Sequence, residues 1–150
     1  MRAYPDTSFL YAFYLKQSNS PIASAYAATM DEPLHVTSLL QYEFRQSLRF
    51  QAWRHTANPR LGIALAEAQE VLTKFERDLE SGIAVLAPCS LADVLRRAED
   101  LSNRRTITGG HRTLDVLHVA TALVLGAEDF LTFDVNQGEL AQAEGLKVKP

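Results

Sequence analysis

The chain has 150 residues, of which 47% are hydrophobic and 22% charged, values ordinary for one soluble globular domain. Its formal net charge of −3 argues against a large non-specific nucleic-acid surface, although it leaves room for a local basic rim. The single cysteine, Cys89, excludes an internal disulfide framework and fits a reducing compartment. The first residues lack the apolar stretch of a signal peptide, and no run approaches the roughly 20 apolar residues of a membrane span. We therefore expect a cytoplasmic protein without membrane contact.

The first third of the chain predicts two short strands, each followed by a helix. Residues 1–6 form a strand that ends at Asp6, and Thr7 and Ser8 are capping-type residues before a helix that starts at Phe9. Pro5 fits only at the end of the strand, because a proline cannot donate to a central ladder. The next predicted elements are a helix over about 21–30, a strand at 35–37 and a helix from 38 to about 54, opened by Ser38 and Gln41 at the capping-box spacing.

The middle of the chain predicts two amphipathic helices around a buried strand. The first helix starts near Leu61, keeps its apolar side chains on one face and ends at Gly82. Residues 83–86 are a continuous apolar strand of the buried parallel type. Ser90 caps a helix over about 91–104, and residues 103–111 are expected to form a loop.

The last third is organised around residues 112–123, a helix that is apolar on nearly every side and is therefore predicted to be buried. The helix stops at Gly126. The remaining predicted elements are a strand over 129–133 that ends at Asp134, a helix over about 136–144 and a strand at 146–148. Because strands alternate with helices throughout, the sequence predicts one α/β domain with a mainly parallel sheet covered on both faces.

Four acids fall where such a sheet binds its ligands, in the crevice beyond the carboxyl ends of the strands. Asp6 follows the first strand, and Asp134 follows the strand at 129–133. Glu43 lies near the start of the helix after the strand at 35–37, and Asp115 lies in the first turn of the buried helix. We therefore expect these four side chains to converge on one pocket.

Such a pocket has a defined chemistry. Carboxylates packed together repel one another, which raises some of their pKa values unless a cation neutralises them. Oxygen ligands suit a hard cation, Mg²⁺ or Mn²⁺, which keeps several waters and leaves room for a substrate phosphate. One or two such ions activate a water and stabilise the leaving oxygen of a phosphodiester. This chemistry needs no protein nucleophile, and none is evident in the sequence.

Four segments carry a resemblance to a known family. They are residues 4–10 (YPDTSFL), 38–44 (SLLQYEF), 114–123 (LDVLHVATAL) and 130–137 (FLTFDVNQ). With these segments in this order, the chain resembles the PIN-domain family, and more particularly the VapC-type toxin ribonucleases of toxin–antitoxin pairs. Pro5 departs from the apolar residue that usually precedes the first acid, which affects the expected strand geometry and not the acid.

The resemblance implies a single PIN domain over residues 1–150, with a mainly parallel sheet of about five strands flanked by helices on both faces. It assigns catalysis and the binding of Mg²⁺ or Mn²⁺ to four acids, Asp6, Glu43, Asp115 and Asp134, with the first and third in the most direct contact with the ion. Supporting hydroxyl groups are expected at Thr7 or Ser8 and at Thr132. The implied partners are an RNA substrate, a cognate antitoxin and a second copy of the chain in a homodimer.

Each acid also has an ordinary structural interpretation. Asp6 and Asp134 suit helix N-caps or turns. Glu43 alone suits a solvated helix position, and a salt bridge to Arg112 is a competing explanation of Asp115. It is the combination of the four acids that favours the metal site.

Other side chains near the acids also allow two interpretations. Arg45, Arg49 and Arg112 are candidates for binding RNA phosphates, although charged helix faces are usually only solvated. Tyr42 and Trp53 could stack bases, with core or dimer packing as the favoured interpretation.

Two further groups are interpreted as packing residues. His118, three residues beyond Asp115, is expected to be a packed or hydrogen-bonded core residue rather than a ligand. The aromatic group at residues 11–15 is expected to be ordinary core, with a dimer interface as the alternative.

The leading hypothesis is a Mg²⁺- or Mn²⁺-dependent endoribonuclease, the toxin of a type II toxin–antitoxin module, which hydrolyses RNA phosphodiesters through metal-activated water. The alternative is a PIN-like RNA- or protein-binding module that keeps the acids as a structural ion site with little catalysis. A receiver or phosphatase domain ranks last, because no lysine lies at the end of a predicted strand.

Overall fold

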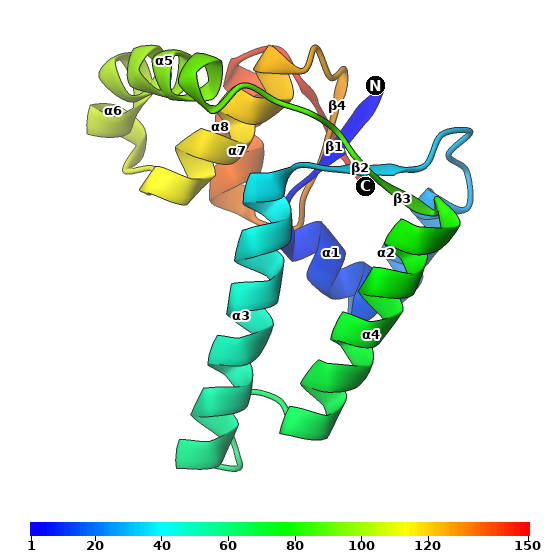
Figure 1. Ribbon diagram of the computed structural model, residues 1–150. Coiled ribbons are helices and arrows are strands. Elements are labelled where there is room, and N and C mark those ends of the chain that lie inside the picture. Colours follow the sequence, from blue (N-terminus) through cyan, green and yellow to red (C-terminus); the bar gives the residue numbers. More distant parts are fainter.

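Five short parallel strands form the frame of the protein in the computed structural model, which describes residues 1–150 (Figure 1). The strands are β1 (Ala3–Pro5), β2 (Leu34–Val36), β3 (Ala84–Leu86), β4 (Asp129–Leu131) and β5 (Lys147–Lys149). β4 lies between β1 and β5 in one ladder, and β2 pairs with β3 in another. The expected α/β fold with a parallel sheet is confirmed.

The sheet is interrupted between β1 and β2, which lie side by side without a shared ladder. The Asp6 N–H donates to the Leu131 carbonyl of β4 at 2.9 Å. Because successive residues of a strand turn their N–H groups to opposite sides, residue 5 is turned toward β2. Pro5 has no N–H to donate there, and the N–H of Ala3, on the same side, goes to the Glu32 carboxylate at 2.9 Å. The proline thus accounts for the gap in the sheet.

Helices fill the connections between the strands. They are α1 (Thr7–Tyr14), α2 (Ser20–Ala27), α3 (Ser38–Ala57), α4 (Leu65–Ser81), α5 (Leu91–Leu101), α6 (Ile107–Gly109), α7 (Thr113–Val124) and α8 (Val135–Ala143), with a wider π-type turn, η1 (Ser102–Thr106), between α5 and α6. None of the helices combines the length and the apolar content that a bilayer span requires.

The two faces of the sheet bury different side chains. Tyr4 of β1 and Phe130 of β4 are neighbours in register and join a core that includes residues of α7 and α8. Ala3 and Leu131 instead join a second core cluster with α1 and α2. Since successive strand residues point to opposite faces, helices cover the sheet on both sides.

The long helices α3 and α4 run side by side away from the sheet (Figure 1). Phe44 of α3 and Phe75 of α4 are both fully buried between the two helices. Their rings pack edge to face, with centroids 5.2 Å apart. Tyr14 of α1 packs against the same pair and donates its hydroxyl to Asp78 at 2.9 Å. Tyr14 and Leu15 are buried, so the core interpretation of this aromatic segment is confirmed for these two residues.

The helix expected to start near Leu61 begins at Leu65 instead. Gly62 adopts a left-handed φ of 68°, and a Cβ built on it would lie 2.0 Å from the Gln51 carbonyl oxygen of α3. The loop therefore approaches the α3 backbone too closely for any other residue, and this approach delays the helix. The predicted end is correct, because Gly82 has a left-handed φ of 81°.

The prediction of a loop at residues 103–111 is also wrong in part, because the helical path of α5 continues through η1 and α6 to Gly109. The cause lies 40 residues away in α8 and its cap. The Glu144 carboxylate accepts hydrogen bonds from Arg104 and Arg105 at 2.9 Å each, and Arg97 lies 3.6 Å from it. These contacts hold the segment against α8 until Gly110 ends it with a left-handed φ of 66°.

We predict that Glu144→Gln lowers the free energy of unfolding at pH 7 by about 1–2 kcal/mol, because charge-assisted hydrogen bonds are lost while the arginines still reach solvent. The hydrogen bond from Arg104 holds the pKa of Glu144 below its usual value. This contribution is therefore present above the unfolded-state pKa and is lost as the pH falls through the folded-state pKa. Urea denaturation at several pH values should show the two proteins converging in acid. The control Asp93→Asn, which removes an exposed pair with Arg96, should change stability by less than about 0.5 kcal/mol. An equal loss in both variants would contradict the assignment.

Candidate active site

A cavity of about 720 Å³ opens at the carboxyl ends of β1 and β4. Its wall contains three of the four predicted acids: Glu43 from α3, Asp115 from α7 and Asp134 from the β4–α8 connection. Thr7 and Ser8 of α1 complete this end of the cavity. Segments more than 100 residues apart in the sequence are thus brought to one site, as the position of the acids at strand ends and helix starts predicts.

Asp115 is half-buried in the first turn of α7. Its Oδ2 accepts the backbone N–H of Arg112 at 3.1 Å. The salt bridge between Asp115 and the Arg112 side chain, considered as the competing explanation, does not form. Arg112 instead lines the same cavity. The other carboxylate oxygen of Asp115 has no protein donor.

Asp134 is exposed and caps α8, since its Oδ1 accepts the Gln137 N–H at 2.9 Å. The capping interpretation of this residue is therefore correct, but a cap engages one oxygen only. Oδ2 of Asp134 has no protein donor, and Asp134 and Gln137 both line the cavity. The Asp134 backbone is fixed in turn, because its N–H donates to the Thr132 hydroxyl at 2.9 Å.

Glu43 lies in the second turn of α3, and its Oε2 accepts hydrogen bonds from the Thr7 hydroxyl and from Nε2 of His118. Burial acts to raise the pKa of Glu43, but the hydrogen bond and the charge of His118, with the bond from Thr7, outweigh it and leave that pKa below its usual value. Glu43 is thus held as a carboxylate, with Oε1 directed to no protein donor. The expected supporting role of Thr7 has a geometric basis in this contact.

His118 connects Glu43 to the core. The ring is fully buried, and its Nδ1 lies 2.9 Å from the hydroxyl of Tyr4, which is also fully buried. Nε2–H donates to Glu43, and Nδ1 shares the second hydrogen bond of the ring with the Tyr4 hydroxyl. Burial raises the pKa of Tyr4, which keeps its hydroxyl protonated for this role. The interpretation of His118 as a hydrogen-bonded core residue is confirmed, and its partner is a site acid.

Asp6 occupies a different position from the other three acids. It is fully buried and does not line the cavity. Its Oδ1 accepts the Phe9 N–H at 2.9 Å and the Ser8 hydroxyl at 2.7 Å, and its Oδ2 accepts the Thr132 hydroxyl at 2.6 Å. Burial raises the pKa of Asp6 in spite of these donors. Asp6 therefore caps α1 and joins β1 to β4 directly behind the cavity, and Ser8 and Thr132 stand beside it as expected.

The donor set can be tested against a divalent cation. In the present side-chain conformations, no three Asp, Glu, His or Cys side chains are close enough to hold one ion. Mg²⁺, however, keeps several waters and usually takes only one or two carboxylates directly. Glu43, Asp115 and Asp134 each keep one oxygen without a protein donor and face one cavity, so these three residues fit a hydrated hard cation. They do not fit a closed cage of four acids.

Of the predicted RNA-binding arginines, only Arg112 lines the cavity. Arg45 faces α4, where it pairs with Glu76 at 2.7 Å and lies 5.5 Å from the centre of the Phe75 ring. Arg49 is exposed on α3 and has no ion pair. The expectation that no lysine ends a strand is wrong, since Lys149 ends β5, but no lysine lines the cavity, which keeps a receiver-type site at a low rank.

Sequence inspection missed several polar residues of the cavity. Gln17 and Asn19 come from the α1–α2 connection, and Gln51 and Tyr11 lie on α3 and α1. Gln51 stands two turns after Glu43, so the helical repeat would have placed both on one face. The loop residues had no such signal.

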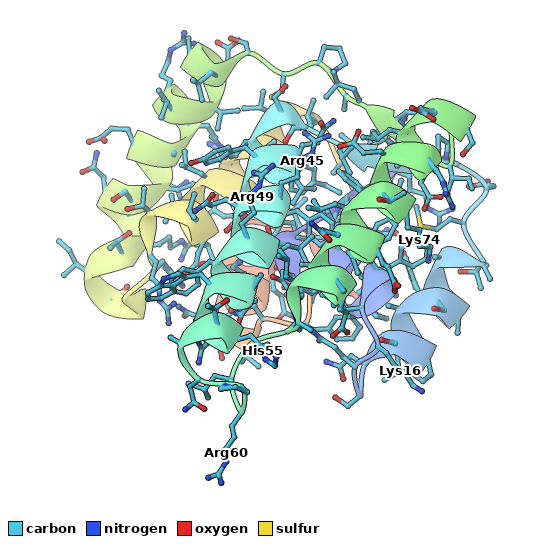
Figure 2. All side chains as sticks on the ribbon, turned by 60° about the horizontal axis from the view of Figure 1, so that its bottom comes forward. Lys16, Arg45, Arg49, His55, Arg60 and Lys74 are labelled. Atoms are coloured by element: carbon cyan, nitrogen blue, oxygen red, sulfur yellow. The ribbon has the colours of Figure 1, made fainter.

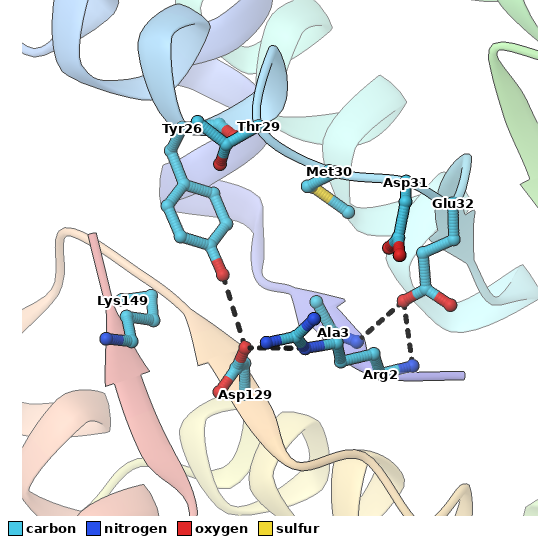
Figure 3. Close-up of a pocket in the computed structure, with 9 residues that line it drawn as sticks. All are labelled: Arg2, Ala3, Tyr26, Thr29, Met30, Asp31, Glu32, Asp129 and Lys149. Atoms are coloured by element: carbon cyan, nitrogen blue, oxygen red, sulfur yellow. Dashed lines mark hydrogen bonds and ion pairs between the residues drawn. The ribbon is translucent and has the colours of Figure 1, made fainter.

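A second, smaller cavity of about 180 Å³ lies at the starts of β1 and β4 (Figure 3). Asp129 there accepts the Tyr26 hydroxyl at 3.3 Å and lies 3.8 Å from Nε of Arg2. Glu32 accepts the backbone N–H groups of Arg2 and Ala3 at 2.7 and 2.9 Å. Because these polar groups satisfy one another, the cavity is explained as a structural feature that ties α2 and the following loop to the sheet.

The protein is therefore an α/β domain with a carboxylate-lined cavity at the carboxyl ends of its strands. The family model described as PIN domain matches residues 3–143. The chain belongs to the PIN-domain family, whose members are generally nucleases. No curated protein sequence gives a significant match.

Solved structures show the same fold at low sequence identity. The Mycobacterium tuberculosis toxin VapC20, which cleaves the sarcin-ricin loop, is 17% identical with a TM-score of 0.67, and 99% of each chain is covered. FitAcB from Neisseria gonorrhoeae is 14% identical with a TM-score of 0.66, over 99% of this chain and 96% of that chain. PAE2754 from Pyrobaculum aerophilum is 20% identical with a TM-score of 0.60, over 99% and 83%. At these identities the likeness concerns the fold.

We predict that Asp6→Asn folds and is at least as stable as the wild type at pH 7, because an amide oxygen can accept from Phe9 and Ser8 without a buried charge. A raised folded-state pKa means that the charge costs stability at neutral pH, and that this cost disappears below the unfolded-state pKa. The advantage of the variant should therefore shrink in acid, measured by urea denaturation. The control Asp6→Ala leaves the three donors without an acceptor and should cost about 2–4 kcal/mol. Equal destabilisation by both substitutions would contradict this account.

Proposed function

We propose that the protein is a Mg²⁺- or Mn²⁺-dependent endoribonuclease and the toxin of a type II toxin–antitoxin module. The single observation that carries the proposal is the convergence of Glu43, Asp115 and Asp134 on one cavity, each with a carboxylate oxygen that no protein group occupies. Membership of a nuclease family and the similarity in fold to the toxin VapC20 support it.

In the proposed mechanism each residue has a distinct role. Asp115, Asp134 and Glu43 would hold the ion, and Asp6 fixes Ser8 and Thr132 behind them. A bound divalent ion supplies an activated water and stabilises the leaving oxygen of the phosphodiester. Arg112, on the wall of the same cavity, places a permanent positive charge where a substrate phosphate enters.

Glu43 has a fixed orientation in this scheme, because the Thr7 hydroxyl and the ring of His118 both hold its Oε2. Tyr4 fixes the ring by a hydrogen bond on its other side. His118 and Tyr4 are thus positioning residues, which act through Glu43 and touch neither ion nor substrate. Mutation of side chains that orient a metal ligand in this way commonly lowers metal affinity or activity 10- to 100-fold.

The proposed partners are single-stranded RNA as substrate, a cognate antitoxin that blocks the toxin, and a second copy of the chain in a homodimer. The support for an antitoxin is the toxin character of a structural relative. A binding module with a structural ion is the alternative that the next experiment separates from a nuclease.

We predict that purified protein cleaves single-stranded RNA with Mn²⁺ and that Asp115→Asn lowers kcat at least about 100-fold, because one of the ion-holding carboxylates is neutralised. The change should leave the fold intact, since an amide oxygen can still accept the Arg112 N–H. RNA cleavage by gel assay and growth inhibition on expression measure the two effects. The matched control is Glu139→Gln, an exposed position of α8 outside the acid wall, which should retain activity. Absence of cleavage by the wild type, together with undiminished toxicity of Asp115→Asn, would favour the binding module.

We predict that Tyr4→Phe lowers kcat about 10-fold while the KM for RNA stays within about twofold, because the substitution frees the His118 ring and Glu43 without touching the substrate. His118→Leu should lose more activity, whereas His118→Gln, whose amide can still donate to Glu43, should restore part of it. Steady-state kinetics and circular dichroism would measure the effect and exclude unfolding. If the leucine and glutamine variants were equally inactive and equally well folded, the positioning role would be wrong.

A further inference from the structure

The exposed aromatic side chains of the protein are confined to one helix face. The chain has one Trp, five Tyr and seven Phe, yet only Tyr42, Phe50 and Trp53 are exposed, at 66%, 49% and 62%. All three lie on α3 at positions i, i+8 and i+11, which share one side of a helix together with Arg49 at i+7. We call these four residues the α3 stripe. Of the two forms of packing expected for Tyr42 and Trp53, core packing is therefore wrong, and dimer packing stays a prediction.

The stripe has the chemistry of a nucleic-acid surface. The rings of Phe50 and Trp53 are already stacked, with centroids 5.4 Å apart and planes inclined by 28°. The Arg49 guanidinium has no ion pair, and α3 carries three arginines with Glu43 as its one acid. Figure 2 shows Arg49 on the outer side of α3 and Arg60 projecting from the loop that follows this helix. Exposed aromatic rings beside an arginine without an ion pair suit the bases and phosphates of a single strand.

The stripe also lies next to the proposed active site. Glu43 and Gln51 line the cavity, and their chain neighbours Tyr42 and Phe50 belong to the stripe. One residue turns a helix by about 100°, so the acidic cavity and the stripe occupy adjacent sides of α3. A strand that enters the cavity at Glu43 can continue across the rings.

We propose that the α3 stripe is a docking surface for single-stranded RNA, in which bases flanking the scissile phosphodiester stack on Trp53, Phe50 and Tyr42 while Arg49 binds a phosphate. The proposal rests on the proposed ribonuclease function and adds how the substrate is held. The charge of the stripe favours RNA over a second copy, because a second copy of the stripe would present Arg49 with no acid to pair with it, whereas RNA presents phosphates.

Trp53 provides the direct test, since it is the only tryptophan of the chain. A single-stranded oligoribonucleotide of mixed sequence is titrated into the Asp115→Asn protein without divalent metal, so that no cleavage occurs. Stacking on Trp53 should quench its fluorescence to saturation. Phe50→Leu should weaken binding roughly 5- to 150-fold, and Arg49→Gln should reduce the slope of log affinity against log salt by about 0.7.

Two controls match these substitutions in chemistry and exposure. Ile107→Ala removes an apolar side chain that is 92% exposed on α6, and Arg96→Gln removes an exposed arginine of α5. Neither should alter quenching or affinity by more than about twofold. Oligonucleotide binding without quenching, or equal weakening by the controls, would overturn the docking surface.

Cleavage kinetics separate this proposal from the nuclease function. If the wild type cleaves RNA with Mn²⁺, Trp53→Leu should raise KM at least fivefold and leave kcat within about twofold. Cleavage that is indifferent to Trp53, Phe50 and Tyr42 would overturn the stripe and leave the nuclease standing. Stripe-dependent binding without cleavage would support the docking surface and overturn the nuclease. A dimer that dissociates on Trp53→Asp, seen by light scattering, would assign the stripe to a second copy and overturn the RNA proposal.

Discussion

The cluster of hydrogen bonds around the buried Asp6 carboxylate is the interaction on which the rest of the site depends. It joins the end of β1 to the end of β4 through Thr132 and fixes the first turn of α1 through Phe9. Ser8 adds a link to the chain after β4, because its hydroxyl also accepts the Phe133 N–H at 2.8 Å. The position of Asp134, one residue later, follows from this cluster. One side chain with two acceptor oxygens can take several donors at once, so a single residue fixes all of these segments.

A second hydrogen-bond network determines the position of Glu43. The chain Tyr4–His118–Glu43 runs from β1 through α7 to α3, so a sheet residue sets the orientation of an acid on a helix from another part of the sequence. The two networks meet at β1, where Tyr4 and Asp6 are separated by Pro5. The same three residues thus interrupt the sheet, support Glu43 and close the back of the cavity. Because each of these residues has a structural role of its own, a strand of three residues is enough to organise the site.

Much of this arrangement could be predicted from the sequence, because it follows from local rules. Strand ends, helix starts and an apolar helix with one acid placed Glu43, Asp115 and Asp134 near one another. The burial of Asp6 could not be predicted, since it depends on Thr132, which is 126 residues away. The helical path of 102–109 depends likewise on Glu144, and the late start of α4 on contact of Gly62 with Gln51. Periodicity also could not distinguish the exposed aromatic residues of α3 from core residues, because both recur at helical spacing.

The cavity between α3, α7 and α8 is proposed to hold a hydrated divalent cation. The most direct measurement is an anomalous difference map from crystals of the wild-type protein soaked in Mn²⁺. We predict one or two peaks inside the cavity, with Asp115 or Asp134 in direct contact and the buried Asp6 behind Ser8 of the cavity wall. A cavity without any peak in well-diffracting, Mn²⁺-soaked crystals would contradict the proposed cation site, as would manganese bound only at a surface outside the cavity.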